Sequence, residues 1–172
     1  MRLLLTLVVV GVSPLIIRAV NRKRISGILL VCYFIAVLAI TLGSRSTDIE
    51  SHVLWNPFIT YRLVIDSVKY GIQKYGWQEL WKRIGWYKEP LNSIALNILL
   101  FVPLGYLVPS VFSFLRRWWR VLLTGLGFSL MIEIVQFLTH LGWFDASDLF
   151  HNTLGAVIGY GIYRRWLREA TE

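Results

Sequence analysis

Apolar residues fall into five runs along the 172-residue chain, and charged or polar residues separate the runs. The runs cover residues 3–17, 25–44, 91–115, 121–138 and 149–163. A helix needs about 20 mostly apolar residues to cross the hydrocarbon core of a bilayer, and somewhat fewer where flanking basic side chains snorkel. The pattern therefore predicts an all-α, polytopic membrane protein with about five transmembrane helices.

The segment between the second and third runs has a different pattern. In residues 45–89, apolar and charged side chains are interleaved at helical spacing, and Trp77, Trp81 and Trp86 follow. Amphipathic helices of this kind lie in the membrane interface with their apolar face toward lipid. We expect an interfacial amphipathic helix here, and the alternative is a solvated loop that rests on lipid.

These elements divide the chain into three parts. Residues 1–44 are expected to form two N-terminal transmembrane helices, residues 45–90 an extracytoplasmic or interfacial segment, and residues 91–172 a three-helix core with a cytoplasmic tail. The first run has the length of a signal peptide, but Pro14 and the basic cluster from Arg18 leave no small-residue cleavage site. We therefore expect this run to be retained.

Composition and charge agree with a membrane protein. Hydrophobic residues make up 56% of the chain and charged residues only 16%, which would leave a soluble domain short of polar surface. The net charge is +8, and Lys and Arg cluster at the ends of the apolar runs, in residues 22–24, 116–120 and 164–168. Such clusters suit anionic lipid headgroups better than a nucleic-acid groove, so we expect no nucleic-acid partner.

The distribution of basic residues also predicts an orientation. The short loops before the second and fourth runs are basic, as is the tail, whereas residues 139–148 contain no Lys or Arg. Basic loops stay on the cytoplasmic side of a membrane. The N-terminus is therefore expected outside and the C-terminus in the cytoplasm, with residues 45–89 and 139–148 facing outward.

A few polar groups interrupt the apolar runs. A carboxylate inside a membrane helix costs about 2.5 to 3.5 kcal/mol, so it normally faces a partner or a water-filled cavity. Glu133 lies in the fourth run, and Gln136 shares its helix face three residues later. Polar residues of the third and fifth runs stand at similar depths. Together they predict an outer-leaflet cleft between three helices, lined by Asn97, Glu133, Gln136, Asp145, Asp148 and Asn152.

Each of these residues also has a purely structural interpretation. Asp145 and Asp148 suit the start of a helix, where acidic side chains cap the backbone and complement the dipole. Asn97 and Asn152 suit hydrogen bonds between membrane helices. Glu133 fits a structural role least well, because its charged form is the most costly to bury.

Glycines in the third and fifth runs indicate close packing. Gly155 and Gly159 form a pattern of small residues four apart, which lets two membrane helices approach closely. Gly105 follows Pro103 in the third run, where we expect it to ease a kink. These glycines therefore indicate helix packing rather than chemistry.

The polar residues also lie within short motifs. These are NPF at residues 56–58, NILLFVPLG at 97–105, IEIVQ at 132–136, and FDASD at 144–148, which leads to NTLG at 152–155. In this order, the motifs resemble the signatures of the VanZ-like family over residues 56–160. Members often carry Arg where this chain has Gly142 and an acid where it has Ser147. The resemblance therefore supplies neither a basic contact to an anion nor a third carboxylate for a metal.

The resemblance implies a place in the bacterial cell membrane. VanZ-like proteins are associated with bacterial envelopes, and the founding member with lowered susceptibility to the lipoglycopeptide teicoplanin. The motifs do not define a molecular activity, so function has to be argued from the chemistry of the site.

Three functions remain open. In the first, the cleft binds the polar headgroup of a lipid or a lipid-linked glycan, and the lipid tails lie between helices. The second is an intramembrane transferase or hydrolase, with Glu133 as general base and Asp145 with Asp148 holding a divalent metal near a phosphate. The third is a scaffold whose polar groups only fix helix packing.

No sequence signature favours the enzyme specifically. The chain has no Ser-His-Asp spacing, glycine-rich phosphate loop or HExxH motif. Cys32 is the only cysteine, so neither an intrachain disulfide nor a cysteine metal site is possible. His140 and His151 flank the acidic residues, but histidines at this boundary are more often interfacial residues than ligands. We therefore expect no metal site and no cofactor.

Overall fold

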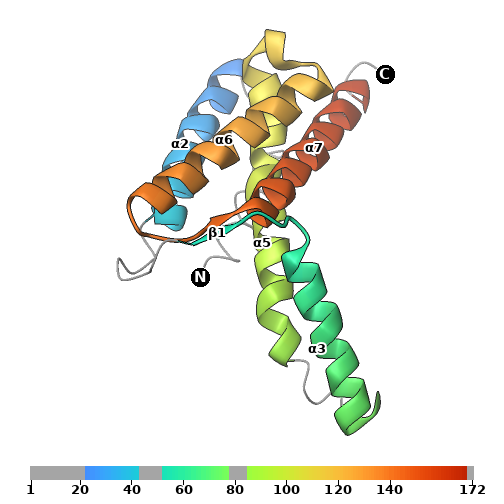
Figure 1. Ribbon diagram of the computed structural model, residues 1–172. Helices are drawn as coiled ribbons and strands as arrows, with labels where there is room; N and C mark the ends of the chain where they lie inside the picture. The colour runs from blue at the N-terminus through green and yellow to red at the C-terminus, as the bar shows by residue number, and fades with distance from the viewer. Residues whose placement is uncertain (1–21, 43–51, 78–84, 170–172) are drawn as a thin grey trace.

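The computed structural model describes residues 22–42, 52–77 and 85–169. Its longer helices are α2 (Arg22–Leu42), α3 (Ile59–Tyr75), α5 (Gly85–Val111), α6 (Trp118–Leu138) and α7 (Ala146–Glu169). The shorter elements are β1 (Val53–Leu54), the 3-10 helix η2 (Ser113–Leu115) and β2 (Phe144–Asp145). Figure 1 shows α2, α5, α6 and α7 packed as a bundle. Helix α3 runs beside the N-terminal part of α5 and projects away from the bundle.

Three of the described helices are long and apolar enough to cross a membrane. They cover Arg24–Leu42, Pro90–Val111 and Trp118–Leu138, and correspond to the second, third and fourth apolar runs. The first run, residues 3–17, lies outside the described residues. The fifth run lies in α7, which is not among the three because polar residues at its start and arginines at its end lower its hydropathy. The predicted count of about five spans is therefore not confirmed.

Helix α7 packs against α5 without side chains between the two backbones. A Cβ atom added at Gly155 would lie 2.1 Å from the Ile98 carbonyl oxygen, and one at Gly159 would lie 2.0 Å from that of Val102. Neither atom would fit without moving a backbone. The close packing predicted from the two glycines is thus confirmed.

Gly105 takes part in the same contact from α5. A Cβ atom there would lie 1.9 Å from the carbonyl oxygen of Ala156. From the sequence, Gly105 is expected only to ease a kink after Pro103. Its packing role cannot be predicted, because that role depends on where α7 passes. Glycines of both helices therefore allow the approach.

Helix α2 packs on the other side of α5. The Tyr33 hydroxyl donates a hydrogen bond of 3.0 Å to the Leu100 carbonyl oxygen. The bond therefore joins α2 to the turn of α5 that precedes Pro103. The apolar residues that surround this contact are buried; they are Leu30, Val37, Phe101, Leu104 and Leu107.

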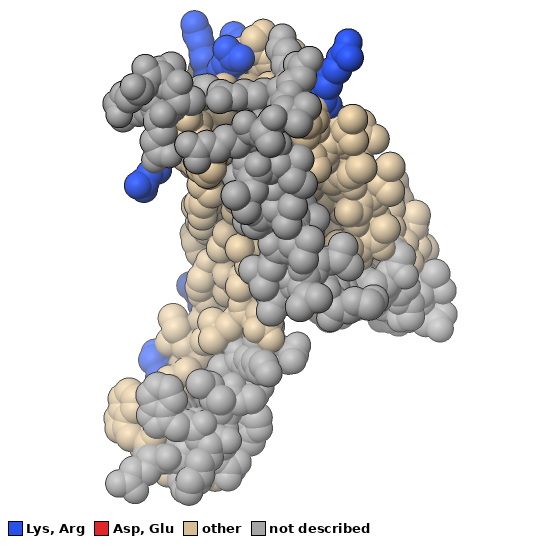
Figure 2. All heavy atoms as spheres, turned by 180° about the vertical axis from the view of Figure 1, so that it is seen from behind, with Lys and Arg blue, Asp and Glu red and all other residues tan. Residues whose placement is uncertain are grey.

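The basic ends of the helices gather at one end of the bundle. The chain direction places the start of α2, the connection from α5 to α6 and the end of α7 together (Figure 1). Figure 2 shows Lys and Arg at this upper end, and others lower down along the projecting part. The exposed arginines concerned are Arg24, Arg116, Arg117, Arg164 and Arg165. The connections that carry β1 and β2 lie at the opposite end.

Helix α3 falls within the segment where an amphipathic helix is expected. Its half-buried side chains follow one stripe, Tyr61, Val64, Val68 and Ile72, while charged side chains face outward. Because α3 contacts α5, this stripe has protein beside it. A position of α3 in a membrane interface stays a prediction. Helix α5 begins at Gly85, inside the segment of residues 45–90.

The glycine contact predicts a large difference between two alanine variants of α7. Gly159→Ala should lower the free energy of unfolding by about 1–3 kcal/mol or more, because its methyl group overpacks the α5 backbone. Gly161→Ala, which meets nothing within 4 Å, should leave stability unchanged or slightly higher. Thermal unfolding of the detergent-purified variants measures both. Equal melting temperatures for the two variants would contradict the contact.

Candidate functional site

A pair of very short strands brings the start of α3 to the start of α7. Strands β1 and β2 pair in parallel, with Val53 opposite Phe144 and Leu54 opposite Asp145. The Phe144 backbone N–H donates a hydrogen bond of 3.0 Å to the His52 carbonyl oxygen. These strands depart from the all-α prediction. The sequence does not predict them, because two residues are too few to show an alternating pattern.

Asp145 caps α7 and is itself held by Glu133. Its Oδ1 accepts hydrogen bonds from the Ser147 backbone N–H at 2.8 Å and from the Ser147 hydroxyl at 2.7 Å. This is the N-cap arrangement, so the capping role predicted for Asp145 is confirmed. The Asp145 backbone N–H donates to Glu133 Oε2 at 2.9 Å. A carboxylate of α6 therefore fixes the residue that begins α7.

Glu133 faces the interior of the protein. Its side chain is only 2% exposed. A lipid-facing carboxylate would lack any partner within the hydrocarbon, whereas here one oxygen accepts a backbone hydrogen bond. Its position therefore agrees with the expectation that it faces a partner.

Asn97 and Asp148 form the second polar pair. The Asn97 amide Nδ2 donates a hydrogen bond to Asp148 Oδ1. Both residues are half-buried, and Asp148 lies in the first turn of α7, where its charge complements the helix dipole. The pair links α5 to α7 near the residue that Glu133 holds, and it is the more accessible of the two pairs.

Gln136 and Asn152 have partners elsewhere. The Gln136 Nε2 donates a hydrogen bond of 3.0 Å to the Thr41 carbonyl oxygen at the end of α2. The Asn152 Nδ2 donates one of 2.9 Å to the Ser129 hydroxyl on α6. Both residues are buried, and each amide oxygen has no hydrogen-bond partner among the described residues. These bonds join helices, as the structural interpretation expects of Asn152.

The six predicted residues thus form two direct pairs and two separate links. Glu133 with Asp145, and Asn97 with Asp148, meet at the start of α7. Gln136 and Asn152 each contact another part of the bundle. Among the described residues, no three His, Cys, Asp or Glu side chains lie close enough together to hold a metal ion.

Further residues at this site cannot be recognised from the sequence. The Tyr61 hydroxyl on α3 lies 2.7 Å from His151 Nε2, and His151 is only 1% exposed. The Thr60 hydroxyl lies 3.5 Å from that of Ser147, which is equally buried. His151 is therefore a buried residue rather than an interfacial one. Its spacing of three residues from Asp148 places both on one face of α7, but no pattern identifies Tyr61.

Aromatic side chains surround the polar residues. The rings of Trp55 and Phe144 are 5.6 Å apart, and those of Phe58 and Phe150 are 5.9 Å apart. Trp143 packs edge-on against His52. Several of these rings are exposed, as is usual where a protein crosses the boundary between lipid and water.

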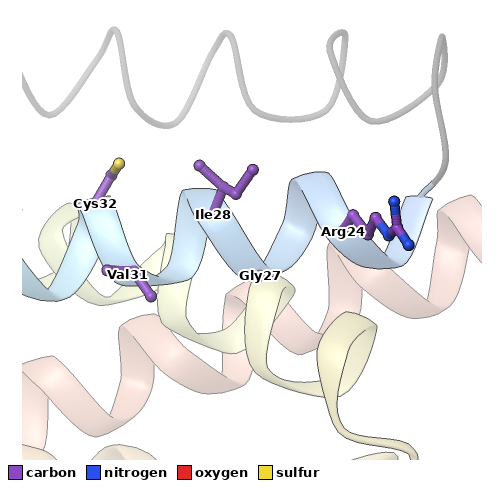
Figure 3. A pocket seen from close by; sticks show the side chains of 5 residues that line it. All are labelled: Arg24, Gly27, Ile28, Val31 and Cys32. Atoms are coloured by element: carbon purple, nitrogen blue, oxygen red, sulfur yellow. The ribbon is translucent and has the colours of Figure 1, made fainter.

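One pocket lies on the outer face of α2, away from these residues. It has a volume of about 490 Å³ and is lined by Arg24, Gly27, Ile28, Val31 and Cys32 (Figure 3). This part of α2 is nearer the basic end of the bundle, whereas Thr41 at the other end of α2 contacts Gln136. The pocket therefore does not extend the polar site.

Comparison with known proteins gives one match. A family model described as VanZ/LLP1 matches residues 30–168, which is most of the chain. The matched range includes both polar pairs and the whole of α5 and α6. No curated protein and no solved structure matches the chain.

The buried link between Asn152 and Ser129 predicts energetic coupling between them. In a double-mutant cycle with Asn152→Ala and Ser129→Ala, the coupling free energy should be about 0.5–1.5 kcal/mol, as for other hydrogen bonds between membrane helices. Ser110→Ala serves as a control, because Ser110 bonds the Tyr106 carbonyl oxygen within its own helix. Its effect should add to that of Asn152→Ala within about 0.5 kcal/mol. Additive effects of Asn152→Ala and Ser129→Ala would refute the link.

Proposed function

The chain belongs to the VanZ/LLP1 family, and we propose that it binds the polar headgroup of an envelope lipid or lipid-linked glycan beside the start of α7. The observation that supports this proposal is the meeting of two polar pairs from α5, α6 and α7 at the end of the bundle opposite the basic helix ends. An integral membrane protein places such an end at the level of lipid headgroups. If the basic helix ends lie in the cytoplasm, the polar pairs lie at the headgroups of the outer leaflet of the bacterial cell membrane.

The aromatic side chains also support a position of the polar site at the level of the lipid headgroups. Trp55 and Trp143 are exposed beside the start of α7, and Trp and Tyr are enriched at the membrane–water boundary. From the polar pairs, the apolar parts of α2, α5 and α6 extend toward the basic end of the bundle. A lipid whose headgroup reached Asp148 would therefore have apolar helix surface beside its tails.

The chemistry of the accessible pair suits hydroxyl-bearing headgroups. The half-buried Asn97 and Asp148 supply an amide and a carboxylate, which donate to and accept from hydroxyl groups of a sugar or of glycerol. Asp145 stands next to them, and the buried Glu133 keeps it in place. In this proposal Asn97, Asp145 and Asp148 contact the headgroup, Glu133 positions Asp145, and Gln136 and Asn152 hold the helices.

A scaffold is the second candidate, and the internal pairing favours it. Every one of the six polar side chains already bonds to another group of the protein. Polar bonds of this kind can simply fix the arrangement of membrane helices. A scaffold would need no ligand, and substitutions would then affect folding or assembly alone.

Two variants of Glu133 separate these functions from catalysis. In Glu133→Gln the amide oxygen can still accept the hydrogen bond from the Asp145 N–H, so folding and headgroup binding should remain. Glu133→Ala leaves a buried donor without an acceptor, which costs about 1–3 kcal/mol and should release Asp145. Lipid mass spectrometry of the gently extracted proteins, and teicoplanin susceptibility at equal membrane abundance, measure the effect.

The outcomes distinguish three functions. Lipid retained by the parent and by Glu133→Gln, but lost from a folded Glu133→Ala, supports headgroup binding. A folded Glu133→Gln that retains lipid but loses all cellular activity indicates a general base. If Asn97→Leu and both Glu133 variants co-purify with as much lipid as the parent, the proposal is wrong and the scaffold stands.

Cysteines replacing two tryptophans at opposite ends of the bundle test the orientation. The two side chains are similarly exposed, so a difference in labelling reports the side of the membrane. Trp143 near the polar site is 45% exposed, and Trp119 near the basic ends is 41% exposed. In a Cys32→Ser background, a cysteine replacing Trp143 should react with a membrane-impermeant thiol reagent in intact cells. One replacing Trp119 should react only after the cells are opened. The reverse result would place the polar site in the cytoplasmic leaflet.

A further inference from the structure

The first turn of α3 covers part of the polar site. Thr60 meets Ser147, and Tyr61 meets His151 at 2.7 Å. Both partners on α7 are only 1% exposed although they lie in its first two turns. Ser147 also donates to the Asp145 carboxylate. The residues under this turn therefore adjoin those that we propose contact the headgroup.

The rest of α3 has few buried contacts. Gly71 is its one buried residue, and the helix projects away from the bundle beside α5 (Figure 1). The turn before the helix contains Pro57, and the helix ends at Gly76, which has a positive φ of 75°. Elements with little buried surface open at low free-energy cost. The bonds of the first turn, together with the β1–β2 pairing that precedes it, therefore hold this end of α3 against α7.

One group beneath the turn is available for a further partner. His151 uses Nε2 toward Tyr61, and its Nδ1 is buried with no hydrogen-bond partner among the described residues. Buried polar atoms are normally paired, so such an atom calls for an explanation. Movement of Tyr61 would free Nε2 of this ring, one turn along α7 from Ser147.

We propose that the first turn of α3 is a gate, held closed by the Tyr61–His151 hydrogen bond, whose opening admits the lipid headgroup to the start of α7. This inference rests on the proposed function. It assigns Tyr61 and His151 as the gate contact and Thr60 with Ser147 as the point where the gate closes. A hydroxyl-bearing headgroup entering here would displace Tyr61 and could hydrogen-bond the His151 ring in its place.

A reversible disulfide tests the gate. The hydroxyl oxygens of Thr60 and Ser147 are 3.5 Å apart, so cysteines at both positions can be joined with little movement. In a Cys32→Ser background, mild oxidation of Thr60→Cys/Ser147→Cys should close the bond. The transfer of phosphatidylglycerol from vesicles to the oxidised protein should be at least tenfold slower than to the same protein after reduction. Mass spectrometry of the transferred lipid measures the rate.

If the contact is purely structural, the oxidised and the reduced protein should take up lipid at the same rate, because a disulfide that fixes the closed arrangement would leave binding intact. Equal transfer before and after reduction would therefore overturn the gate, as would failure of the disulfide to form. The same assay with vesicles that also contain an undecaprenyl-linked muropeptide tells a glycan ligand from a glycerol headgroup. If the parent takes up neither lipid, the proposed function fails. The labelling experiment below then still tests whether the Tyr61–His151 contact keeps the first turn of α3 closed.

Loosening the gate provides an independent measurement. Tyr61→Phe removes only the hydroxyl that meets His151, whereas Tyr70→Phe removes one that contacts Lys74 on the exposed side of the same helix. In the Ser147→Cys, Cys32→Ser protein, Tyr61→Phe should increase thiol labelling of residue 147 several-fold, and Tyr70→Phe should not. Equal labelling in both variants would overturn the proposed role of Tyr61. This result does not depend on whether the double-cysteine protein binds lipid.

Discussion

The contact between the backbones of α5 and α7 is the constraint on which the rest of the structure depends. Gly105, Gly155 and Gly159 bring the two helices so close that a methyl group at any of them would strike the opposite backbone. Without a strong hydrophobic drive between helices in lipid, such close packing is a main source of association. It places α7, whose first two turns carry Ser147, Asp148, His151 and Asn152, against both α5 and α6. The polar side chains of α7 therefore find protein partners instead of lipid.

The start of α7 follows from that placement. The first N–H groups of a helix need acceptors, and Asp145 provides one for the Ser147 N–H while its own N–H is satisfied by Glu133. Asn97 then meets Asp148 from α5. Capping and headgroup binding need not exclude each other, because capping uses one carboxylate oxygen of Asp145 and leaves the other oxygen of that carboxylate to a ligand.

Membership of the VanZ/LLP1 family agrees with this arrangement, since the matched range contains all the residues that form the two polar pairs. The family does not define what the site binds. The headgroup proposal therefore depends on three features of the molecule. They are the polar pairs, the exposed aromatic rings beside them and the separation of both from the basic helix ends.

The sequence by itself determined the apolar helices α2, α5 and α6, because length and hydropathy are properties of a continuous segment. It also indicated the packing glycines of α7 and the burial of Glu133, because a small-residue pattern and a charge in an apolar run can be read locally. Only the tertiary structure decided that Tyr61 meets His151, 90 residues away, and that Gln136 meets Thr41, 95 residues away. These partners sit on helices whose relative position no local pattern encodes. The path of α3 across the start of α7 had the same origin: it depends on a two-residue strand pairing, which is too short to leave a periodic signal.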